Sequence, residues 1–506
     1  MQLTELVNVM EVTEVTGPVG PEISALCCDS RQVAPGTLFF ALPGTIVNGL
    51  DYVPQALDRG AVAVVAETIP PGWTGERTLL LVKNIRRCMA LAASYYYHQP
   101  SDGLPVVGIT GTNGKTTVTY LLEAILKQAD YSPAVFGTVN YRLGDRSIVS
   151  SHTTPESVEL MRVMAEFRQQ GADALILEVS SHALEQHRAD GIKFDIAVFT
   201  NLTPEHLDYH GEMDSYFASK RRLFSDLLGE GRAVVNRDDA FGKRLLKEFP
   251  NAISFGGTGT DVSVERIELG RDGISGSFKT PAGMVVVNSS LIGEFNVSNL
   301  LAGVAAATAL GLTAEQIAAG IAAAPQVPGR LERVANDLGV LALVDYAHTG
   351  DALEQVLRTL NQLDRRNLIS LVGCGGDRDP AKRPVMAAAA TSYSDLTILT
   401  SDNPRTEDPL TILAQMREGA LANSSTEYGP EEVDQIRGKA FVVIPDRREA
   451  IRFACRQARS GDLLLVAGKG HEDYQIIGRE KVHFDDREEL ALALESQRTN
   501  GVQGDV

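Results

Sequence analysis

The sequence predicts an α/β protein of three domains: a smaller N-terminal α/β domain, a central P-loop domain with a mostly parallel sheet, and a C-terminal doubly wound, Rossmann-like domain. The 506 residues exceed what one hydrophobic core covers, and roughly 150 residues per domain gives about three domains. A glycine-rich turn joins an apolar run to an amphipathic stretch near residue 110. Short apolar runs alternate with helical patterns over the last third of the chain. We place the domains at residues 1–98, 99–333 and 334–506.

The composition is that of a soluble globular protein, with 44% apolar and 22% charged residues. No apolar run approaches the ~18 residues that a membrane-spanning helix needs. The first residues, "MQLTELVNVMEVTEV", carry acids where a signal peptide needs a basic start. Five scattered cysteines without a CxxC pair favour a reducing cytoplasm, and the net charge of -18 opposes nucleic-acid binding. We expect a cytoplasmic monomer with no nucleic-acid partner and no membrane insertion.

The expected elements follow in order along the chain. The N-terminal domain should hold short strands at "GTLFFAL" and "GAVAVVAE", which glycines and prolines separate. A turn-rich link, "HQPSDGLP", leads to the β-branched run "PVVGIT". The stretch "KTTVTYLLEAILKQA" then has apolar residues at helical spacing, so strand, loop and helix are predicted. The runs "ALILEV" and "DIAVFTNL" predict buried strands of a mostly parallel sheet.

The loop "TGTNGKTT" between that strand and helix is the strongest functional signal. Gly111 and Gly114 let the backbone curl until its N–H groups converge on a phosphate, and the helix N-terminus adds positive potential. Lys115 can reach the β- and γ-phosphate oxygens, and the Thr116 hydroxyl can bind Mg²⁺. Ile109 stands where the strict GxxxxGK[ST] pattern has its first glycine. A nucleoside triphosphate site is predicted, with a plain glycine-rich turn as the alternative. The predicted ligands are Gly111, Thr112, Asn113, Gly114, Lys115, Thr116 and Thr117.

Three further residues could serve Mg²⁺ chemistry. Glu178 ends the apolar run in "LILEVSSH", where a carboxylate can hold Mg²⁺ directly or through water. His206 in "NLTPEHLDYHG" follows another strand, but imidazole is an unusual Mg²⁺ ligand, so its chemistry alone favours a hydrogen-bonding role. Lys220 in "DSYFASKRRLF" is, without further context, a lysine on a helix surface.

The C-terminal domain repeats a strand and then a helix, as a doubly wound sheet does. In such sheets, ligands bind beyond the carboxyl ends of the strands. The charged residues that directly follow apolar runs are Asp345, Arg378, Arg405 and Lys469. Arg405, in "TSDNPRTEDP", is either a solvated loop cation or a group held to bind a ligand, because Pro404 stiffens the chain before it.

Seven motifs carry a resemblance to a known family. They are "GTNGKTT", "EVSSHALEQHR", "NLTPEHLDYHG", "YFASK", "GEFNVSNLLAG", "PGRLERV" and "DYAHTGDAL". In this order and spacing they resemble the Mur ligase superfamily, ATP-dependent amide-forming enzymes of bacterial cell-wall synthesis. The resemblance covers nearly the whole chain. It departs at Gly350, where the family usually has proline; this loosens a helix start and removes no functional group.

The resemblance implies three cofactors and several ligands for them. It implies that Lys220 is carbamylated by CO₂, which turns a cation into an anion able to hold a second Mg²⁺. Glu178 and His206 would serve the metal ions with Thr116, and Lys115 would join them in catalysis. ATP would also contact Asn296, Arg330 and Asp345. The implied cofactors are therefore ATP, Mg²⁺ at two sites, and the carbamylated Lys220.

The resemblance also implies the other substrates, UDP-MurNAc-L-Ala-D-Glu and meso-diaminopimelate. The stretch "CCDSRQVAPGTLFFAL" resembles a uridine-nucleotide-binding domain, with Ser30 and Arg31 near the pyrophosphate or uridine. The "DNPR" motif marks family members that add meso-diaminopimelate. Arg405 would pair with the second carboxylate of this amino acid, which lysine lacks, and Arg378 would add a second cation. Glu472 would accept the far ammonium group.

Two sets of residues are therefore implied to bind these substrates. Those for the nucleotide precursor are Ser30, Thr153, Thr154, Ser180, Gln186 and Arg188. Those for the amino acid are Arg378, Asp402, Asn403, Pro404, Arg405, Gly468 and Glu472. Plain loop capping is the alternative for Thr153, Thr154 and Ser180.

The implied reaction begins when the D-Glu γ-carboxylate attacks the γ-phosphorus of ATP and forms an acyl phosphate, which the amine of diaminopimelate then attacks. The base that takes the amine's proton stays open among His206, His210 and Asp345. Other functions also stay open: a lysine-adding ligase, a folylpolyglutamate-synthetase-like ligase, a P-loop ATPase without an amine acceptor, and a non-catalytic nucleotide-binding module.

Overall fold

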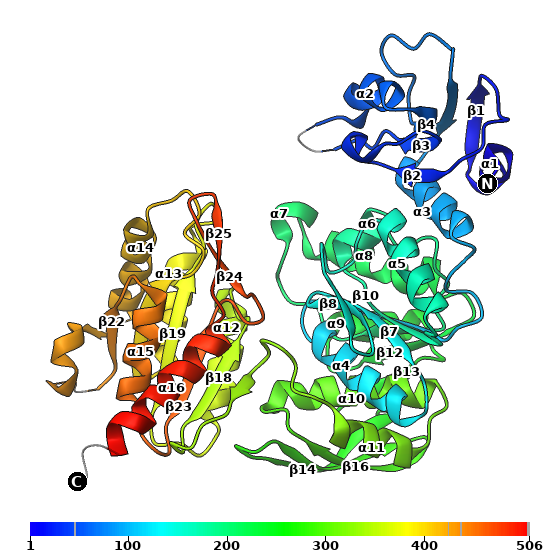
Figure 1. Cartoon of the computed structure of the whole chain (residues 1–506). Helices are drawn as coiled ribbons and strands as arrows, with labels where there is room; N and C mark the ends of the chain where they lie inside the picture. The colour runs from blue at the N-terminus through cyan, green and yellow to red at the C-terminus, as the bar shows by residue number, and fades with distance from the viewer. Residues whose placement is uncertain (45–46, 424, 436–437, 503–506) are drawn as a thin grey trace. The chain divides into compact units, whose positions relative to one another are not determined.

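The chain folds into two compact units in which helices cover β-sheets (Figure 1). The structure, a computed structural model, describes residues 1–44, 47–423, 425–435 and 438–502. The first unit comprises Met1–Glu265, Phe278–Val285 and Asn299–Ala323, and the second Arg266–Ser277, Val286–Ser298 and Ala324–Val506. Separate sheets lie in the N-terminal, central and C-terminal parts, which confirms the predicted three-domain α/β fold. The exact boundaries at residues 98/99 and 333/334 stay predictions.

The N-terminal part is a small sheet in the order β1-β5-β4-β3-β2 with helices beside it. Its elements are α1 (Leu3–Val9), β1 (Val12–Thr16), β2 (Ala25–Cys27), β3 (Thr37–Phe40), α2 (Val53–Asp58), β4 (Ala61–Ala66), β5 (Thr78–Val82) and α3 (Ile85–Tyr96). Strands β2 to β5 pair in parallel, and β1 pairs antiparallel with β5. The apolar runs predicted as strands in this part are β3 and β4.

The central part is a long sheet in the order β16-β15-β14-β13-β12-β11-β6-β10-β7-β8-β9. Its strands are β6 (Val106–Thr110), β7 (Pro133–Phe136), β8 (Asn140–Leu143), β9 (Arg146–Val149), β10 (Ala174–Glu178), β11 (Ile196–Phe199), β12 (Arg232–Asn236), β13 (Ile253–Gly256), β14 (Val262–Leu269), β15 (Ile274–Thr280) and β16 (Gly283–Ser289). Its helices are α4 (Lys115–Gln128), α5 (Ser157–Gln169), α6 (Ser181–Glu185), α7 (Leu207–His210), α8 (Met213–Arg222), α9 (Ala240–Glu248), α10 (Glu294–Ala309) and α11 (Ala314–Ala323).

The middle of this sheet is parallel and buried. Strand β6 lies between β10 and β11, and both pair with it in parallel. Its residues are buried throughout, as the β-branched run predicts. Because parallel neighbours end at the same edge, the loops after Thr110, Glu178 and Phe199 leave the sheet together. These loops carry the phosphate-loop motif, "SSHALEQHR" and "NLTPEHLDYHG".

Helix α4 follows the glycine-rich turn and packs into the core. Gly114 precedes it in a left-handed conformation, with φ +89°, which glycine adopts at little cost. Helix α11 crosses α4 at Gly320, where a Cβ would lie 2.3 Å from the Cα of Ile125. Only a glycine therefore allows the two helix backbones to approach this closely.

The C-terminal part is a sheet in the order β17-β18-β23-β19-β20-β22-β21, with a separate β24-β25 hairpin. Its strands are β17 (Glu332–Val334), β18 (Leu341–Asp345), β19 (Leu368–Cys374), β20 (Leu396–Ser401), β21 (Thr426–Glu427), β22 (Ala440–Val443), β23 (Leu463–Ala467), β24 (Tyr474–Ile477) and β25 (Glu480–His483). Its helices are α12 (Gly350–Asn361), α13 (Lys382–Tyr393), α14 (Pro409–Ala422), α15 (Arg447–Gln457) and α16 (Asp486–Val502).

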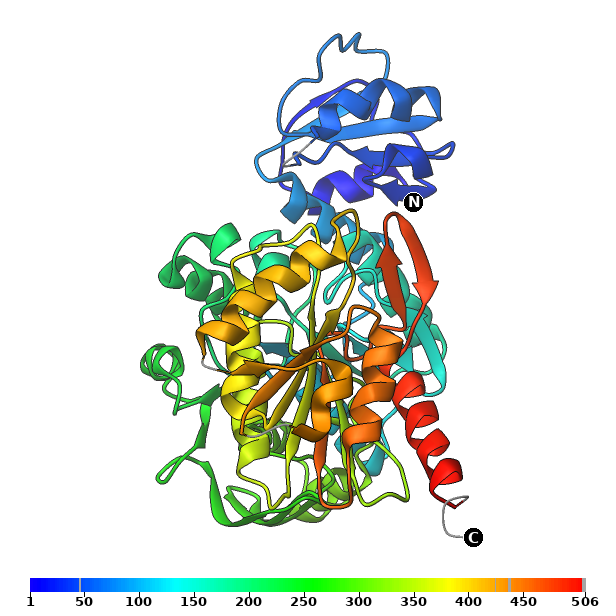
Figure 2. The same cartoon turned by 90° about the vertical axis from the view of Figure 1, so that its left-hand side faces the viewer.

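Helices cover both faces of this sheet, so the doubly wound prediction is confirmed (Figure 2). Alternate strand residues enter opposite cores: Leu343 and Leu465 pack with α12, α13 and α14, while Val344 and Val466 pack with α15 and α16. This alternation follows from the two-residue period of a strand. Within the described residues, no helix is both long and apolar enough to cross a membrane.

A buried ion pair ties the ends of two central strands. Arg447 and Asp486 are both 0% exposed and lie 2.6 Å apart. The Arg447 guanidinium also donates to the carbonyl oxygens of Ser401, at 3.3 Å, and Ala467, at 3.1 Å. These are the last residues of β20 and β23, so one cation sets where the loops after both strands begin.

We expect Arg447→Met to destabilise the protein by about 3–5 kcal/mol, because it leaves a buried carboxylate and two carbonyls without their partner. The matched control is Arg448→Met, whose ion pair with Glu489 is partly exposed and should contribute less than about 1 kcal/mol. Urea unfolding of both variants measures the difference. Equal losses would contradict the structural role given to Arg447.

Candidate functional site

The phosphate-loop motif forms a tight turn that neighbouring strands hold in place. Gly111 has φ +148° and Gly114 has φ +89°. A Cβ at Gly114 would lie 2.2 Å from Asn299 Oδ1, so the loop has no room for a side chain there. Asn201 accepts hydrogen bonds from the N–H groups of Thr112 and Asn113, both at 2.9 Å. Two loop amides are thus used within the protein, and the turn is fixed from the β11 side.

Two lysines donate to the same loop carbonyl. Lys115 Nζ lies 2.9 Å from the Gly111 oxygen, and Lys220 Nζ lies 3.0 Å from it. Lys220 is 1% exposed, so the interpretation as a helix-surface lysine is wrong. Burial, followed by repulsion from Lys115, holds the pKa of Lys220 well below its usual value, against the attraction of Glu205. A neutral amine is therefore accessible at Lys220, as reaction with CO₂ requires.

A cluster of aromatic rings lies next to Lys220, and sequence reasoning missed its central member, Tyr216. Tyr216 places its hydroxyl 3.2 Å from Thr112 Oγ1 and its ring 4.5 Å from Lys220 Nζ. His210 stacks on Tyr216, with centroids 4.9 Å apart, and its Nε2 lies 3.0 Å from Ser181 Oγ. The i, i+4 spacing of Tyr216 and Lys220 in "YFASK" is the signal that could have found this contact.

His206 lies beside these rings in a strained conformation. Its φ is +57°, which is uncommon for a residue other than glycine and costs about 1–3 kcal/mol. Burial, then the charges of Lys115 and Lys220, lower its pKa, although Glu205 opposes this. The ring of His182 meets it edge-on, with centroids 4.9 Å apart.

Glu178 is a buried carboxylate next to the phosphate loop. It is 1% exposed and accepts hydrogen bonds from Thr116 Oγ1 at 3.1 Å and from the N–H and hydroxyl of Thr138 at 3.1 and 3.0 Å. The Thr116 hydroxyl and the Glu178 carboxylate are oxygen donors of the kind that Mg²⁺ prefers. No cluster of three His, Cys, Asp or Glu suited to a metal occurs in the described chain. A site with only a few protein oxygens suits Mg²⁺, because this ion usually keeps several waters and also binds substrate phosphates.

Three residues assigned to the nucleotide precursor, Thr153, Thr154 and Ser180, lie close to Glu178 and are already hydrogen-bonded. Thr153 Oγ1 lies 3.0 Å from Thr138 Oγ1, and Thr154 Oγ1 donates to the Glu178 carbonyl at 2.7 Å. Ser180 caps α6 by accepting from the N–H of Ala183. For Thr154 and Ser180, the structure therefore contains the capping contacts of the alternative interpretation.

Arg188 and Gln186 form a second part of this surface. Arg188 donates to the carbonyl of Thr154 and to Gln186 Oε1, both at 2.8 Å, and pairs with Glu156 at 3.0 Å. Its Nε is buried without a hydrogen-bond partner. The guanidinium is thus fixed in orientation by the protein.

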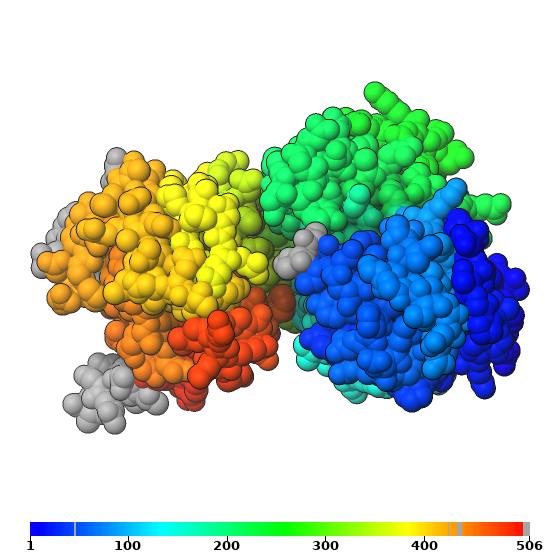
Figure 3. Space-filling view, turned by 90° about the horizontal axis from the view of Figure 1, so that it is seen from above, coloured from blue at the N-terminus to red at the C-terminus, as the bar shows by residue number. Residues whose placement is uncertain are grey.

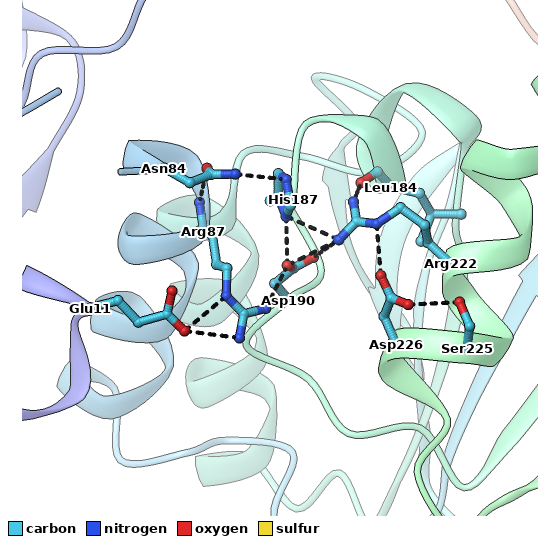
Figure 4. A network of polar contacts seen from close by, with 9 residues as sticks. All are labelled: Glu11, Asn84, Arg87, Leu184, His187, Asp190, Arg222, Ser225 and Asp226. Atoms are coloured by element: carbon cyan, nitrogen blue, oxygen red, sulfur yellow. Dashed lines mark hydrogen bonds and ion pairs between the residues drawn. The ribbon is translucent and has the colours of Figure 1, made fainter. Parts of the chain in front are cut away.

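A buried carboxylate joins this surface to the N-terminal part (Figure 4). Asp190, whose side chain is 0% exposed, accepts from His187 at 2.6 Å and from Arg87 and Arg222 at 3.2 Å. Asn84, the cap of α3, contacts the other ring nitrogen of His187 at 2.9 Å. Although burial raises the pKa of Asp190, the His187 hydrogen bond and the nearby charges lower it overall. The Asp190 carboxylate therefore connects residues 84–87, 187–190 and 222.

In the N-terminal part, Ser30 and Arg31 follow β2. Ser30 is buried and donates to Gln55 Oε1 at 2.7 Å. The Arg31 side chain is 80% exposed and pairs with Asp29 at 2.8 Å. Its hydrogen bonds lower the pKa of Asp29 to about 2. Arg31 is thus accessible to an anionic ligand, and Ser30 is occupied within the protein.

In the second unit, the Asp402–Arg405 loop is tied to two neighbours. Arg405 has φ +51°, and its Nη1 donates to the Gly376 carbonyl at 2.7 Å. Its backbone bonds to Ile476 and Gly478 of the β24-β25 hairpin. The half-buried guanidinium is thus oriented by the loop after β19 and by the hairpin. The surfaces of these segments, yellow through red, are visible in Figure 3.

Arg378 and Arg405 both lie next to Gly375: a Cβ there would lie 2.9 Å from Arg405 Nη1 and 3.8 Å from Arg378 Cγ. Hydrogen bonds from Thr406 lower the pKa of Asp377, and the charges of Arg405 and Arg378 add to this effect. Arg378 is exposed. Both predicted cations are therefore near each other at the carboxyl edge of the sheet.

Gly468 and Glu472 lie in the loop after β23. The Gly468 N–H donates to the Asp345 carbonyl at 3.1 Å, and Asn403 donates to Glu472 at 3.1 Å. A Cβ at Gly468 would lie 4.0 Å from Asp402 Oδ2, so the loop after β23 contacts the Asp402–Arg405 loop at both Gly468 and Glu472.

The remaining predicted ATP contacts also lie in the second unit. Asp345 is 5% exposed and accepts from the N–H groups of Leu331 and Ala347. Burial raises its pKa, and Arg330 opposes this effect. Arg330 lies over the Tyr346 ring at 4.8 Å. Asn296 is buried and donates to the Ile292 carbonyl at 2.7 Å.

Comparison with family models matches three segments of the chain. Residues 22–75 match "Mur ligase family, catalytic domain", residues 109–307 match "Mur ligase middle domain", and residues 329–470 match "Mur ligase, glutamate ligase domain".

Individual proteins also match over nearly the full length. A protein of Geobacter metallireducens is 50% identical over 99% of this chain and 100% of its own length, and one of Geobacter sulfurreducens is 49% identical over 98% and 99%. Both are named UDP-N-acetylmuramoyl-L-alanyl-D-glutamate--2,6-diaminopimelate ligase. A solved structure of a protein with the same name is 33% identical, with a TM-score of 0.71 over 98% of this chain and 99% of that one.

We expect the folded protein to become less stable in acid because of His182 and its neighbours His206 and His210. Burial, followed by His206 and His210, lowers the pKa of His182 to about 4 from 6.5. Because the unfolded chain binds this proton more tightly, the contribution of His182 is complete above pH 6.5 and is lost as the pH falls toward 4. We expect His182→Gln to lose less stability than the unaltered protein between pH 7.5 and 4.5 in thermal unfolding. The exposed His152→Gln change is the control, and an unaltered pH slope in His182→Gln would contradict this account.

Proposed function

This chain belongs to the Mur ligase family, and from that premise we propose that it joins meso-2,6-diaminopimelate to the D-Glu of UDP-MurNAc-L-Ala-D-Glu with the use of ATP. The observation that carries the proposal is the tethered Arg405 of the "DNPR" loop in a chain 50% identical, end to end, to a protein named for this reaction. The product would be the tripeptide precursor of peptidoglycan.

Arg405 gives the proposal its substrate specificity. Diaminopimelate differs from lysine by a second carboxylate, and a guanidinium can bind it through two parallel hydrogen bonds. The Gly376 carbonyl accepts a hydrogen bond from Nη1 and so orients the remaining N–H donors of the guanidinium. Lysine would leave the half-buried Arg405 without an anionic partner, which costs affinity. Arg378 adds a second positive charge.

The first unit would activate the D-Glu carboxylate. That carboxylate attacks the γ-phosphorus of ATP, and the bond to the β-γ bridging oxygen breaks, which yields ADP and an acyl phosphate. Lys115 moves from the Gly111 carbonyl to the phosphate oxygens and neutralises the charge that keeps the two anions apart. Thr116 and Glu178 would hold Mg²⁺, which supplies further charge neutralisation when bound.

Lys220 is proposed to carry a carbamate. Its neutral amine attacks the carbon of CO₂, an N–C bond forms, and the nitrogen loses a proton. The burial of Lys220 and its lowered pKa support the neutral amine that this step needs. The resulting anion, with His206, would serve a second Mg²⁺.

The second unit would supply the amine. The amine attacks the acyl phosphate carbon, and the tetrahedral intermediate releases phosphate to leave the amide. His206, His210 and Asp345 stay candidates for the base that takes the amine's proton. ATP would also contact Arg330, Asp345 and Asn296. Water must be excluded from the site, because an exposed acyl phosphate hydrolyses.

We further propose that the enzyme is a cytoplasmic monomer. All five cysteines are free thiols, in keeping with a reducing compartment. The nucleotide precursor would bind near Ser30, Arg31 and the Thr153–Arg188 surface.

The decisive assay supplies ATP, Mg²⁺ and UDP-MurNAc-L-Ala-D-Glu with either meso-diaminopimelate or L-lysine, and weighs the product. We expect the mass of the diaminopimelate tripeptide and little lysine product.

Arg405→Ala should lose diaminopimelate activity by several hundredfold while ATP binding is kept, because a charged bidentate contact is removed. The exposed Arg452→Ala is the control. Equal loss with both amines, or efficient lysine addition by the unaltered enzyme, would refute this assignment.

Lys220→Ala should be inactive, because neither an amine nor a carbamate remains. Short-chain carboxylates should restore part of the activity by replacing the missing anion, and they should not affect a Lys115→Ala variant. Because a carbamate loses CO₂ in acid, intact-mass analysis of active enzyme is done at neutral pH, and a spectrum with only unmodified lysine would contradict the carbamate.

A further inference from the structure

A fully buried lysine lies behind the loops that carry the proposed amino-acid contacts. Lys469 directly follows Gly468, and its side chain is 0% exposed. Its Nζ lies 3.2 Å from Glu472 Oε2 and 3.6 Å from Asp402 Oδ1. Asn403 Oδ1 is 3.5 Å away. One ammonium group therefore contacts both loops.

The two carboxylates reach solvent, whereas the lysine does not. The side chain of Glu472 is 20% exposed and that of Asp402 is 13% exposed. A ligand can touch either carboxylate but has no access to Lys469. Lys469 is therefore placed to act through its neighbours and not by direct contact with the substrate.

The cluster needs a cation at this position. Asp402 Oδ1 is buried without a hydrogen-bond partner, and a second carboxylate shares the same ammonium group. Arg447 also attracts Asp402 and Glu472, but its charge is compensated by Asp486 at 2.6 Å. The positive charge of Lys469 thus balances one of the two carboxylates. The cluster keeps a net charge of minus one, which a ligand can neutralise.

We propose that Lys469 is a positioning residue for the amino-acid substrate: it compensates Asp402 and orients Glu472, so that Glu472 presents one fixed negative charge to the far ammonium group. This inference rests on the proposed function. Glu472 Oε2 is held between Lys469 Nζ and Asn403 Nδ2, at 3.2 and 3.1 Å. Two charge-assisted donors on one oxygen fix the carboxylate before the substrate arrives.

The charge balance suits a zwitterion. The far end of diaminopimelate carries one ammonium and one carboxylate group. A single net negative charge near Glu472 and the positive charge of Arg405 match these two groups. Without Lys469, the additional negative charge of Asp402 would repel the substrate carboxylate, and Glu472 would lose one of its two donors.

The test measures KM for each substrate in Lys469→Met, which keeps the length of the side chain and removes the charge. We expect KM for meso-diaminopimelate to rise about 10- to 100-fold, since a charged hydrogen bond is lost. KM for ATP and for the nucleotide precursor should stay within about twofold of the starting values. Lys481→Met is the matched control, because Lys481 lies over the same Tyr474 ring, at 3.7 Å against 5.3 Å for Lys469, but is exposed.

A double variant separates charge balance from packing. Lys469→Met with Asp402→Asn removes one charge of each sign, so it should recover a measurable part of the lost diaminopimelate affinity. It also keeps the test valid if Lys469→Met alone fails to fold. A double variant no better than the single one, an unchanged KM for diaminopimelate, or an equal rise in all three KM values would overturn the proposal. Failure of the unaltered protein to make the tripeptide would instead reject the proposed function.

Discussion

Both candidate sites depend on one constraint of parallel sheets: the strands that carry functional loops end at the same edge. In the first unit, β6, β10 and β11 end there and deliver the glycine-rich loop, Glu178 and the His206 loop. In the second unit, β19, β20 and β23 do the same for Arg378, Arg405 and Glu472. Buried side chains then hold the loop bases: Lys220 donates to the Gly111 carbonyl, and Arg447 donates to the carbonyls of Ser401 and Ala467.

The acidic chain has to bind its proposed anionic substrates through local donors. With a net charge of -18, long-range attraction of anionic substrates is unavailable, so local donors must capture them. Strained residues accompany these donors: His206, Asp377 and Arg405 all have positive φ. Such conformations cost about 1–3 kcal/mol each and persist only where surrounding contacts enforce them. At Arg405 and Asp377 the enforcing contacts include side-chain hydrogen bonds, to the Gly376 carbonyl and from Thr406.

Local signals in the sequence were sufficient for the fold class, the phosphate loop and the strand ends. Strand and helix periods, glycines and apolar runs act over a few residues, and the structure confirms the elements they predict. The contacts of Lys220 and Lys469 could not be predicted this way. Lys220 meets Gly111 across 109 residues and Lys469 meets Asn403 across 66, so the burial of these lysines depends on tertiary packing. Arg447 was missed for the same reason, since its partners Ser401, Ala467 and Asp486 lie far along the chain. Tyr216 was also missed, although its i, i+4 spacing to Lys220 is a local signal.

The shared carboxylate of Asp190 has a consequence for recombination within the family. Its partners come from the N-terminal helix α3, from the loop after α6 and from the end of α8. A chimera that joins the N-terminal part of one homologue to the body of another would inherit the carboxylate from one parent and Arg87 with Asn84 from the other. Viable crossovers must therefore preserve both halves of this network, which makes the N-terminal part a less interchangeable module than its separate sheet implies.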